Sequence, residues 1–328
     1  MPAELTNTHR DPRADAAFSR ARVLVTGAGG FLGRHLCRAL TARDATVFGV
    51  SRRPDAGHCA LVMVGDCADL DFVRRAVEAA RPDVIFHLAG SADGSRDLDR
   101  VIPGLHDDLV STVTLLTAAT EFKAARIVVT GSMEEPDLSA QDCTPSSPYA
   151  AAKLCVGFYA RMFHAVYGAP VTLLRPFVTY GPGQSETKLI PYVIRSLQAR
   201  RSPRLSNCDR AVDLVYVDDM VAAFLRSALG PPCPDGIELG SGRLVRLREV
   251  VDLIRRLMKS DVEPQFGALA DRKHEQVRTA RTDRAADSLG WQATTPIDEG
   301  LRRTIAWYDE HPGTPVGNSH PSASNLVS

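Results

Sequence analysis

A glycine-rich turn near the start of the chain places the strongest constraint on its fold. An apolar run over residues 22–26 leads directly into a glycine-rich segment over 27–33, and a helical stretch follows. Gly27, Gly30 and Gly33 have no Cβ, so the backbone at this turn can approach a pyrophosphate bound at the positive N-terminal end of the helix. A turn of this kind between a strand and a helix predicts a dinucleotide site, although glycines also occur in purely structural turns.

The chain repeats this pattern of a short apolar run followed by a helical stretch as far as residue 180. Alternating strands and helices predict a parallel sheet with helices on both faces. The expected fold class is therefore α/β, with a Rossmann-type doubly wound parallel sheet. The predicted strands cover 22–26, 46–50, 61–64, 83–88, 126–130 and 171–174.

Beyond residue 180 the sequence is richer in proline and less regular, which predicts a smaller α/β substrate-binding region. A strand near 213–217 is expected to return to the first domain. The polar, weakly patterned ends of the chain are expected to be flexible. The expected division is a flexible tail over 1–20, a dinucleotide-binding domain over 21–180 with a return segment of about 210–235, a substrate-binding region over 181–209 and 236–311, and a flexible tail over 312–328.

The end of the second predicted strand indicates which dinucleotide is bound. A carboxylate about 20 residues after the glycine turn suits the ribose hydroxyl of NAD, whereas an arginine suits the 2′-phosphate of NADP. The strand ends in Ser51, Arg52 and Arg53, and no carboxylate follows before Asp55. NADP is therefore the expected cofactor and NAD remains possible, because two arginines are also typical of a solvated strand end. Asp66, after the third predicted strand, fits either an adenine contact or a turn.

The segment SPYAAAK over 147–153 carries the expected catalytic chemistry. Tyr149 and Lys153 are four residues apart, so on a helix both side chains face the same pocket. A lysine ammonium beside a tyrosine favours the phenolate, and it is expected to lower the pKa of Tyr149 from its usual value of about 10. Ser132 follows the predicted strand 126–130 at the carboxyl edge of the sheet, where its hydroxyl can hydrogen-bond a reacting oxygen.

Further motifs accompany these segments. In order, the chain carries Thr26 to Gly33, Asp66, His87-Leu88-Ala89, Ser132, Tyr149 to Lys153, Arg175-Pro176-Phe177, Tyr180-Gly181-Pro182, Tyr216-Val217-Asp218-Asp219 and Leu289-Gly290-Trp291. With these motifs the chain resembles the extended short-chain dehydrogenases/reductases of the NAD(P)-dependent nucleotide-sugar epimerase/dehydratase family, over roughly residues 21–310.

The resemblance implies a nicotinamide cofactor, an NDP-sugar substrate and a catalytic set of Ser132, Tyr149 and Lys153. It also implies a homodimer formed through two helices per subunit, one of which carries Tyr149. His87 is expected to be a buried wall residue rather than an acid or base. The residues expected to contact the cofactor are Gly27, Gly30, Phe31, Leu32, Gly33, Ser51, Arg52, Arg53, Asp66, Cys67, Leu88, Ala89, Tyr149 and Lys153.

Glu134 bears on the net reaction. It stands two residues after Ser132, where the family's 4,6-dehydratases and decarboxylases carry a glutamate and its simple 4-epimerases do not. Once C4 is a ketone the hydrogen at C5 is acidic, and a carboxylate here can remove it. Met133, however, occupies the place of an aspartate that protonates the departing oxygen in glucose-type dehydratases, and methionine cannot donate a proton. Glu134 is thus a candidate second acid/base, with a solvated loop as the alternative.

Other departures from the family pattern leave the nucleotide and the sugar unassigned. Val178 replaces an asparagine that contacts the sugar nucleotide in many members, and Asp107-Asp108 lie where an asparagine commonly opens the fourth helix. Basic side chains suit a pyrophosphate but are also common on surfaces. With that alternative open, the candidate substrate ligands are Lys188, Arg210 and Arg272.

The expected function is transient oxidation at C4 of an NDP-hexose, followed by epimerisation or dehydration. An NADPH-dependent reductase of an NDP-4-keto-sugar is the alternative enzyme, and the run from Ser51 to Arg53 favours it. A non-catalytic dinucleotide sensor is an alternative of another class. The presence of Ser132, Tyr149 and Lys153 counts against that sensor.

The amino-acid composition limits the classes of partner that the protein is expected to bind. Lysine plus arginine equals aspartate plus glutamate at 39 each, which argues against nucleic acid and anionic membranes as partners. The seven cysteines are scattered without a metal-binding pattern, so no metal is expected and the thiols are expected to be reduced. The chain has no signal-peptide pattern and no apolar run long enough to span a bilayer, so a cytoplasmic protein is expected.

Overall fold

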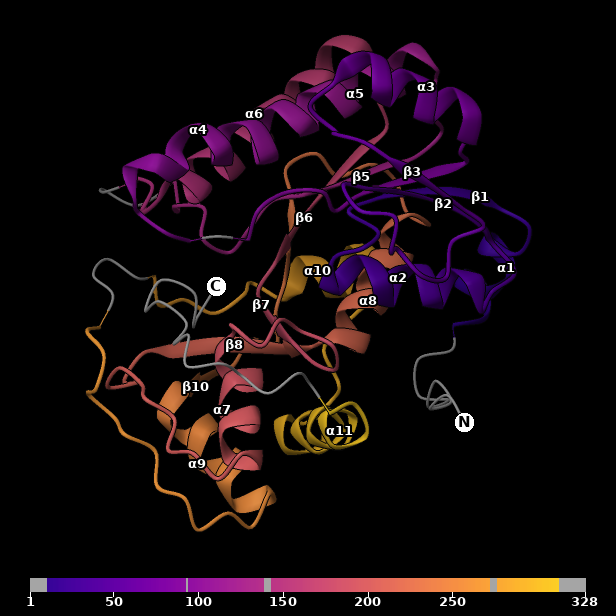
Figure 1. Cartoon of the computed structure of the whole chain (residues 1–328). Helices are drawn as coiled ribbons and strands as arrows, with labels where there is room; N and C mark the ends of the chain where they lie inside the picture. Colours follow the sequence, from indigo (N-terminus) through magenta and orange to yellow (C-terminus); the bar gives the residue numbers. More distant parts are fainter. Residues whose placement is uncertain (1–10, 93, 139–142, 272–275, 313–328) are drawn as a thin grey trace.

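The computed structural model describes residues 11–92, 94–138, 143–271 and 276–312, and within these ranges seven strands form one parallel sheet (Figure 1). The predicted Rossmann-type sheet and its six predicted strands are confirmed, and a seventh strand lies at one edge. In their order across the sheet, the strands are β3 (Leu61–Val64), β2 (Thr46–Ser51), β1 (Arg22–Thr26), β4 (Val84–His87), β5 (Ile127–Thr130), β6 (Val171–Pro176) and β9 (Ile237–Leu239).

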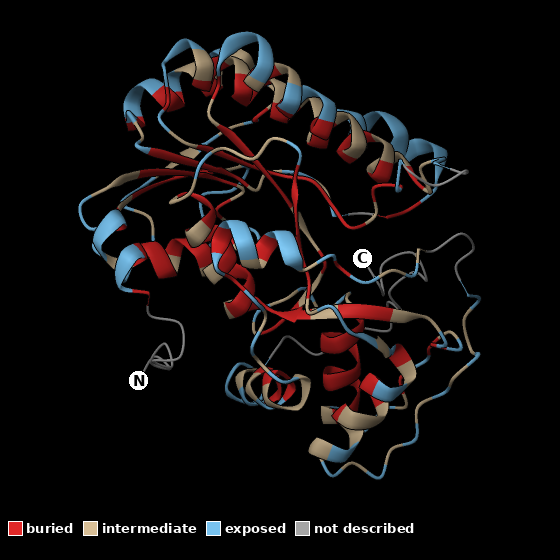
Figure 2. Ribbon diagram, turned by 180° about the vertical axis from the view of Figure 1, so that it is seen from behind, coloured by how far each residue is buried: buried red, intermediate tan, exposed pale blue. Residues whose placement is uncertain are grey.

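Helices cover both faces of this sheet and bury the central strands (Figures 1 and 2). Val23, Leu24 and Val25 of β1 are fully buried, as expected for a parallel strand that packs against helices on both sides. No helix in the described ranges is long and apolar enough to cross a membrane. One face carries α3 (Leu70–Ala80), α5 (Ser111–Glu121) and α6 (Pro148–Tyr167), and the other carries α2 (Phe31–Thr41), α8 (Val217–Ser227) and α10 (Asp283–Leu289).

A run of helical turns connects β4 to α5. Its third part is a π-helix, which is uncommon in proteins and is often found at functional sites. The π-helix packs against α6, the helix that carries Tyr149 and Lys153. The parts of this run are η2 (Leu98–Arg100), α4 (Val101–Gly104) and the π-helix η3 (Leu105–Val110).

A smaller region lies below the large sheet in Figure 1. Its described part contains a three-stranded sheet in the order β10-β8-β7, in which β8 is parallel to β7 and antiparallel to β10. Three helices pack around a separate apolar core beside it. The elements are β7 (Val178–Tyr180), α7 (Leu189–Gln198), β8 (Ala211–Tyr216), β10 (Leu244–Arg246), α9 (Leu247–Leu257) and α11 (Ile297–Glu310).

The strand expected to return to the large sheet near 213–217 belongs instead to the small sheet, as β8. Asp213 gives the physical reason, because this fully buried carboxylate needs hydrogen-bond donors and finds them in the C-terminal part of the chain. It accepts hydrogen bonds from the backbone N–H groups of Ser241, Gly242 and Ala280, at 2.7, 2.9 and 3.1 Å. The segments that do return to the large sheet are α8, which packs on α2, and β9.

The expected flexible tail over 1–20 is corrected by a short helix, α1 (Pro12–Phe18), that is part of the fold. Asp11 caps this helix by accepting a hydrogen bond from Arg13 N. Phe18 is 1% exposed and its ring lies 6.3 Å from that of Phe86 in the core. The buried aromatic ring ties this otherwise polar segment to the sheet. Residues 1–10 and 313–328 of the two expected tails lie outside the described residues.

The burial of Phe18 predicts the contribution of α1 to stability. Phe18→Ala is expected to lower the free energy of unfolding by about 3 kcal/mol, because a buried aromatic ring is removed and a cavity is left. Urea unfolding followed by circular dichroism measures it. Phe122→Ala is the matched control, since Phe122 is 44% exposed and its loss is expected to cost less than about 1 kcal/mol. Equal, small effects of both substitutions would contradict the packing of α1.

Candidate active site

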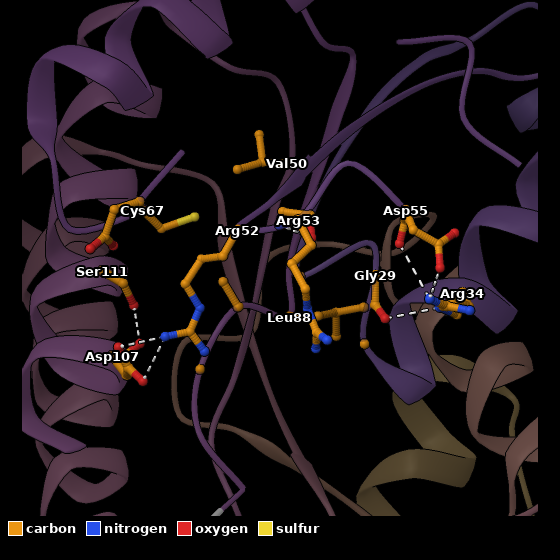
Figure 3. A pocket seen from close by; sticks show the side chains of 16 residues that line it. Gly29, Arg34, Val50, Arg52, Arg53, Asp55, Cys67, Leu88, Asp107 and Ser111 are labelled. Atoms are coloured by element: carbon orange, nitrogen blue, oxygen red, sulfur yellow. Dashed lines mark hydrogen bonds and ion pairs between the residues drawn. The ribbon is translucent and has the colours of Figure 1, made fainter. Parts of the chain in front are cut away.

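A pocket opens beyond the carboxyl ends of β1, β2 and β4 (Figure 3). This is the edge of a doubly wound sheet at which ligands bind. The pocket encloses about 940 Å³, including space open to solvent. It is lined by Gly27, Gly29, Gly30, Arg34, Val50, Ser51, Arg52, Arg53, Asp55, Asp66, Cys67, Leu88, Ala89, Gly90, Asp107 and Ser111.

The glycine turn has a geometry that larger residues cannot adopt. Gly27 has a φ of +68°, and a Cβ there would lie 2.7 Å from the carbonyl oxygen of Leu88. A Cβ on Gly33 would lie 2.1 Å from the carbonyl oxygen of Gly27. The backbone is thus packed tightly on itself, and the N-terminus of α2 faces the pocket with no acidic side chain in its first turn. These features fit the pyrophosphate of a dinucleotide.

Three arginines lie around the part of the pocket near the end of β2, and they differ in whether an acidic side chain pairs with them (Figure 3). Arg34 pairs with Asp55 at 2.8 Å, so the first carboxylate after β2 is already neutralised. Arg52 reaches Asp107 on the π-helix at 3.3 Å. The guanidinium of Arg53 has no hydrogen-bond or ion-pair partner among the residues that the structure describes. Arg53 is therefore the cation most available to a ligand at this end.

The other expected cofactor contacts divide into two groups. Asp66, Cys67, Leu88 and Ala89 line the pocket, and Asp66 also closes a turn by accepting a hydrogen bond from Ala68 N. The side chains of Phe31 and Leu32 do not line it. They pack on the apolar core of the smaller region.

His87 is a buried structural residue, as expected. Thr112 donates its hydroxyl proton to the carbonyl of Asp108 at 2.6 Å, so the 3.1 Å contact between its oxygen and His87 Nε2 is donated by the histidine. His87 Nδ1 then accepts from the hydroxyl of Thr26 at 2.7 Å. Burial lowers the pKa of His87 to about 3, with a smaller effect from the charge of Lys153. The ring is therefore neutral and has no spare nitrogen for proton transfer.

Tyr149 lies in the first turn of α6. Ser147 caps this helix by accepting a hydrogen bond from Ala150 N at 3.1 Å, and Pro148 starts it. Burial raises the pKa of Tyr149, as do the negative charges of Asp108, Glu134 and Glu135, while a hydrogen bond with Ser132 lowers it. The structure thus brings Ser132 and Tyr149 together.

The expectation that Lys153 lowers the pKa of Tyr149 is wrong for this structure. The ammonium of Lys153 lies 5.8 Å from the centre of the Tyr149 ring. It makes a 3.1 Å ion pair with Asp108 and donates a 3.1 Å hydrogen bond to the carbonyl of Thr130. The nearby carboxylate offsets the charge of the lysine, and the sequence alone did not reveal this partner.

The loop after β5 is buried rather than solvated at its centre. Glu135 is 3% exposed and accepts hydrogen bonds from Arg175 Nε at 2.7 Å and from Ser132 N at 2.8 Å. Glu134 is half-buried, and its backbone N–H donates to Ser132 Oγ at 3.1 Å. Met133 is buried against Phe177. The loop therefore holds Ser132 from both sides and leaves Glu134 on the Tyr149 side.

The two candidate substrate ligands that the structure describes, Lys188 and Arg210, contact different segments of the chain. Lys188 donates to the carbonyl of Ala92 at 3.2 Å and lines a small apolar hollow beside β7 and α7. Arg210 donates to the carbonyl of Gln276 at 3.0 Å. Arg272 lies outside the described residues. Within the described ranges no group of His, Cys, Asp or Glu side chains is arranged to hold a metal ion.

Sequence reasoning missed two residues that support the catalytic set. No role was expected for Glu135, and Arg175 was noted only as part of a motif. A glutamate three residues after Ser132 and an arginine near the end of β6 were the available signals, since β5 and β6 are neighbours in the sheet. What was lacking was their pairing across 40 positions of the chain.

Comparisons with known proteins agree with this geometry. The family described as "NAD dependent epimerase/dehydratase family" matches residues 23–231. A UDP-glucose 4-epimerase of Mycolicibacterium smegmatis is 30% identical over 315 residues, which are 88% of this chain and 98% of the relative. A dTDP-D-glucose 4,6-dehydratase of Mus musculus is 25% identical over 315 residues, covering 88% of each chain.

Solved structures share the fold. The crystal structure of a UDP-glucose 4-epimerase from Thermotoga maritima with UDP-glucose has a TM-score of 0.82 at 22% identity, covering 88% of this chain and 98% of the other. A dTDP-glucose 4,6-dehydratase double mutant from Streptomyces venezuelae, solved with NAD, has a TM-score of 0.78 at 25% identity. The match covers 88% of this chain and 97% of the other. By its sequence and its fold, this chain belongs to the NAD-dependent epimerase/dehydratase family.

Proposed function

We propose that the protein oxidises C4 of an NDP-hexose transiently and returns the hydride after epimerisation or dehydration of the sugar. The observation that carries the proposal is the proximity of the Ser132 and Tyr149 hydroxyl groups beside a pocket whose glycine turn fits a dinucleotide. When bound in this pocket, a nicotinamide supplies the acceptor and donor of hydride. The names of the relatives, which include 4-epimerases and 4,6-dehydratases of nucleotide-sugars, support the same reaction class.

The residues of the site divide the proton chemistry. Tyr149 takes the proton of the C4 hydroxyl on oxidation and returns it to the C4 oxygen on reduction. Ser132 is held by Glu135 and by its own loop, so its hydroxyl is positioned to hydrogen-bond the same oxygen. Lys153 pairs with Asp108 and fixes α6 to the end of β5.

Glu134 is the proposed second acid/base. It is half-buried, and it is close enough to Tyr149 for its charge to raise the pKa of the phenol. A carboxylate there can remove the acidic C5 proton of a 4-keto sugar. Met133 is buried and has no proton to give, so it cannot act as the acid in an elimination of water at C6.

A reductase of an NDP-4-keto-sugar is the second candidate. The high pKa of Tyr149 favours it, because a protonated phenol is the form that donates to a ketone. Arg53, which has no partner in the described part of the chain, favours it as well, since NADPH is the usual reducing cofactor. Steady consumption of NADPH with a keto-sugar would select this candidate, and turnover without added cofactor would exclude it.

Incubation with a panel of NDP-hexoses in D₂O, followed by mass spectrometry and NMR, tests the proposal. Loss of water with deuterium at C5 establishes dehydration, and unchanged mass with inverted C4 establishes epimerisation. Tyr149→Phe is expected to reduce turnover by about 10²- to 10⁴-fold, because it removes the proton carrier. An unchanged rate in that variant would refute the role of Tyr149, and a parent protein without turnover on any NDP-hexose would favour a non-catalytic sensor.

The Glu134→Gln variant separates the two reaction types in the same assay. If the protein is a dehydratase, the variant is expected to lose about 10²-fold or more in deuterium incorporation at C5, because the amide cannot accept the proton. Asp137→Asn is the matched control, since Asp137 is an exposed carboxylate three positions further along. If C4 inversion proceeds unchanged in Glu134→Gln, Glu134 has no part in the reaction.

We propose further that the cofactor is NADP, bound at its 2′-phosphate by Arg53 with Ser51. Arg53→Ala is expected to weaken NADP binding by about 10- to 100-fold, the loss of one charge-assisted hydrogen bond, and to leave NAD binding nearly unchanged. Isothermal titration with both dinucleotides measures this. Arg52→Ala should have a smaller effect, because Arg52 already pairs with Asp107. A parent protein that binds NAD more tightly than NADP would contradict the proposal.

We also propose a homodimer that uses α4 with η3 and the neighbouring helix α6. Ile102 and Leu105 are 70% and 42% exposed, and Phe158 and Tyr159 of α6 are 48% and 38% exposed. Exposed apolar side chains on adjacent helices indicate a protein contact surface. Sedimentation is expected to show a dimer that Ile102→Asp with Phe158→Asp converts to a monomer. A monomeric parent protein would contradict this.

A further inference from the structure

A buried carboxylate faces the catalytic lysine. Asp108 Oδ1 lies 3.1 Å from Lys153 Nζ, and the two side chains are 0% and 5% exposed. The same oxygen accepts a hydrogen bond from Ser91 N at 3.1 Å. Gly90 leaves room for the pair, because a Cβ there would lie 2.5 Å from Asp108 Oδ1 and 3.3 Å from Lys153 Nζ. The surrounding backbone is thus shaped to hold this ion pair.

The second oxygen of Asp108 is also buried, and it has no hydrogen-bond partner in the part of the chain that the structure describes. A buried carboxylate with one unpaired oxygen acts strongly on neighbouring charges, since little water screens it. Burial raises the pKa of Asp108, and Lys153 and the hydrogen bond from Ser91 oppose that change. After burial itself, the charge of Asp108 is the largest influence that raises the pKa of Tyr149.

We infer that Asp108 is a positioning residue that cancels the charge of Lys153 and so keeps Tyr149 as a protonated phenol. The site is then set as a proton donor to a carbonyl oxygen, and it favours the reductive half of the reaction. This consequence for direction rests on the proposed function, whereas the ionisation of Tyr149 does not. The π-helix η3 supplies the carboxylate, because Asp108 projects from it towards α6 while Asp107 pairs with Arg52.

The other charged groups around Tyr149 do not replace Asp108. Glu134 and Glu135, on the loop after β5, act in the same direction but more weakly. Glu135 is also paired with Arg175 at 2.7 Å. His87 on β4 is neutral and contributes no charge. Removing the charge of Asp108 therefore leaves the Lys153 ammonium facing the phenol without its counter-ion.

Spectroscopic titration of Tyr149 in Asp108→Asn tests the inference. The amide keeps an oxygen that accepts from Lys153 and Ser91 but carries no charge. The phenolate signal of Tyr149 is obtained by subtracting the same titration of a matched Tyr149→Phe protein, because the chain has seven tyrosines. In Asp108→Asn this signal is expected to appear about one to three pH units lower than in the parent protein.

Two controls define the cause of the shift. Adding Lys153→Met to Asp108→Asn is expected to move the Tyr149 signal back towards high pH, because it removes the lysine charge that Asp108→Asn leaves without a counter-ion. Asp107→Asn removes a carboxylate one position away and is expected to leave the signal in place. If Asp108→Asn does not fold, Asp108→Ser provides the same measurement. Identical Tyr149 titrations in the parent protein and the folded Asp108 variant would overturn the inference.

The pH dependence of turnover separates this inference from the proposed function. With an active NDP-sugar, the limb of the oxidation rate that rises with pH should move to lower pH in Asp108→Asn, since oxidation needs the phenolate. A shifted titration without activity on any NDP-sugar would leave the role of Asp108 standing and refute the proposed function. Activity on an NDP-sugar with an unshifted Tyr149 titration would support the proposed function and refute the role of Asp108.

Discussion

The buried ammonium of Lys153 is the interaction on which the candidate site depends. It joins three elements, because the lysine comes from α6, its carbonyl partner Thr130 ends β5, and its counter-ion Asp108 lies on the π-helix η3. A buried charge without a partner is strongly destabilising, so these elements must lie together for the fold to be stable. The same pairing that fixes the geometry also sets the charge that Tyr149 experiences.

The site has two halves that the fold supports differently. In the half of the site that fits a dinucleotide, the shape of the glycine turn comes from the backbone, which packs tightly at Gly27 and Gly33 after β1. The sugar half depends on side chains, because Glu135 binds Ser132 N and Arg175 across neighbouring strands. Arg278 from the C-terminal region donates to the carbonyl of Glu135. The segment that precedes α10 is thus coupled directly to the loop that carries Ser132.

Most of the large sheet could be predicted from the sequence. Each strand is a short apolar run followed by a helical stretch, and such a run can be recognised without knowing its partners elsewhere in the chain. The helix α1 could not, because its largely polar sequence gives no sign that Ala14 and Phe18 are buried. The position of β8 depended on where the donors for Asp213 lie, far along the chain. The partner of Lys153 was missed for the same reason, as Asp108 and Lys153 are brought together only by the packing of η3 on α6.

In the proposed reaction the carbon at C4 loses a hydride rather than a proton, and an NDP-hexose deuterated at C4 tests this step most directly. NMR and mass spectrometry of the product locate the label after turnover in ordinary water. A hydride that is removed and returned within one site predicts that the deuterium stays on a carbon of the product sugar. Exchange of that deuterium with water would show proton abstraction at C4 and would contradict the account.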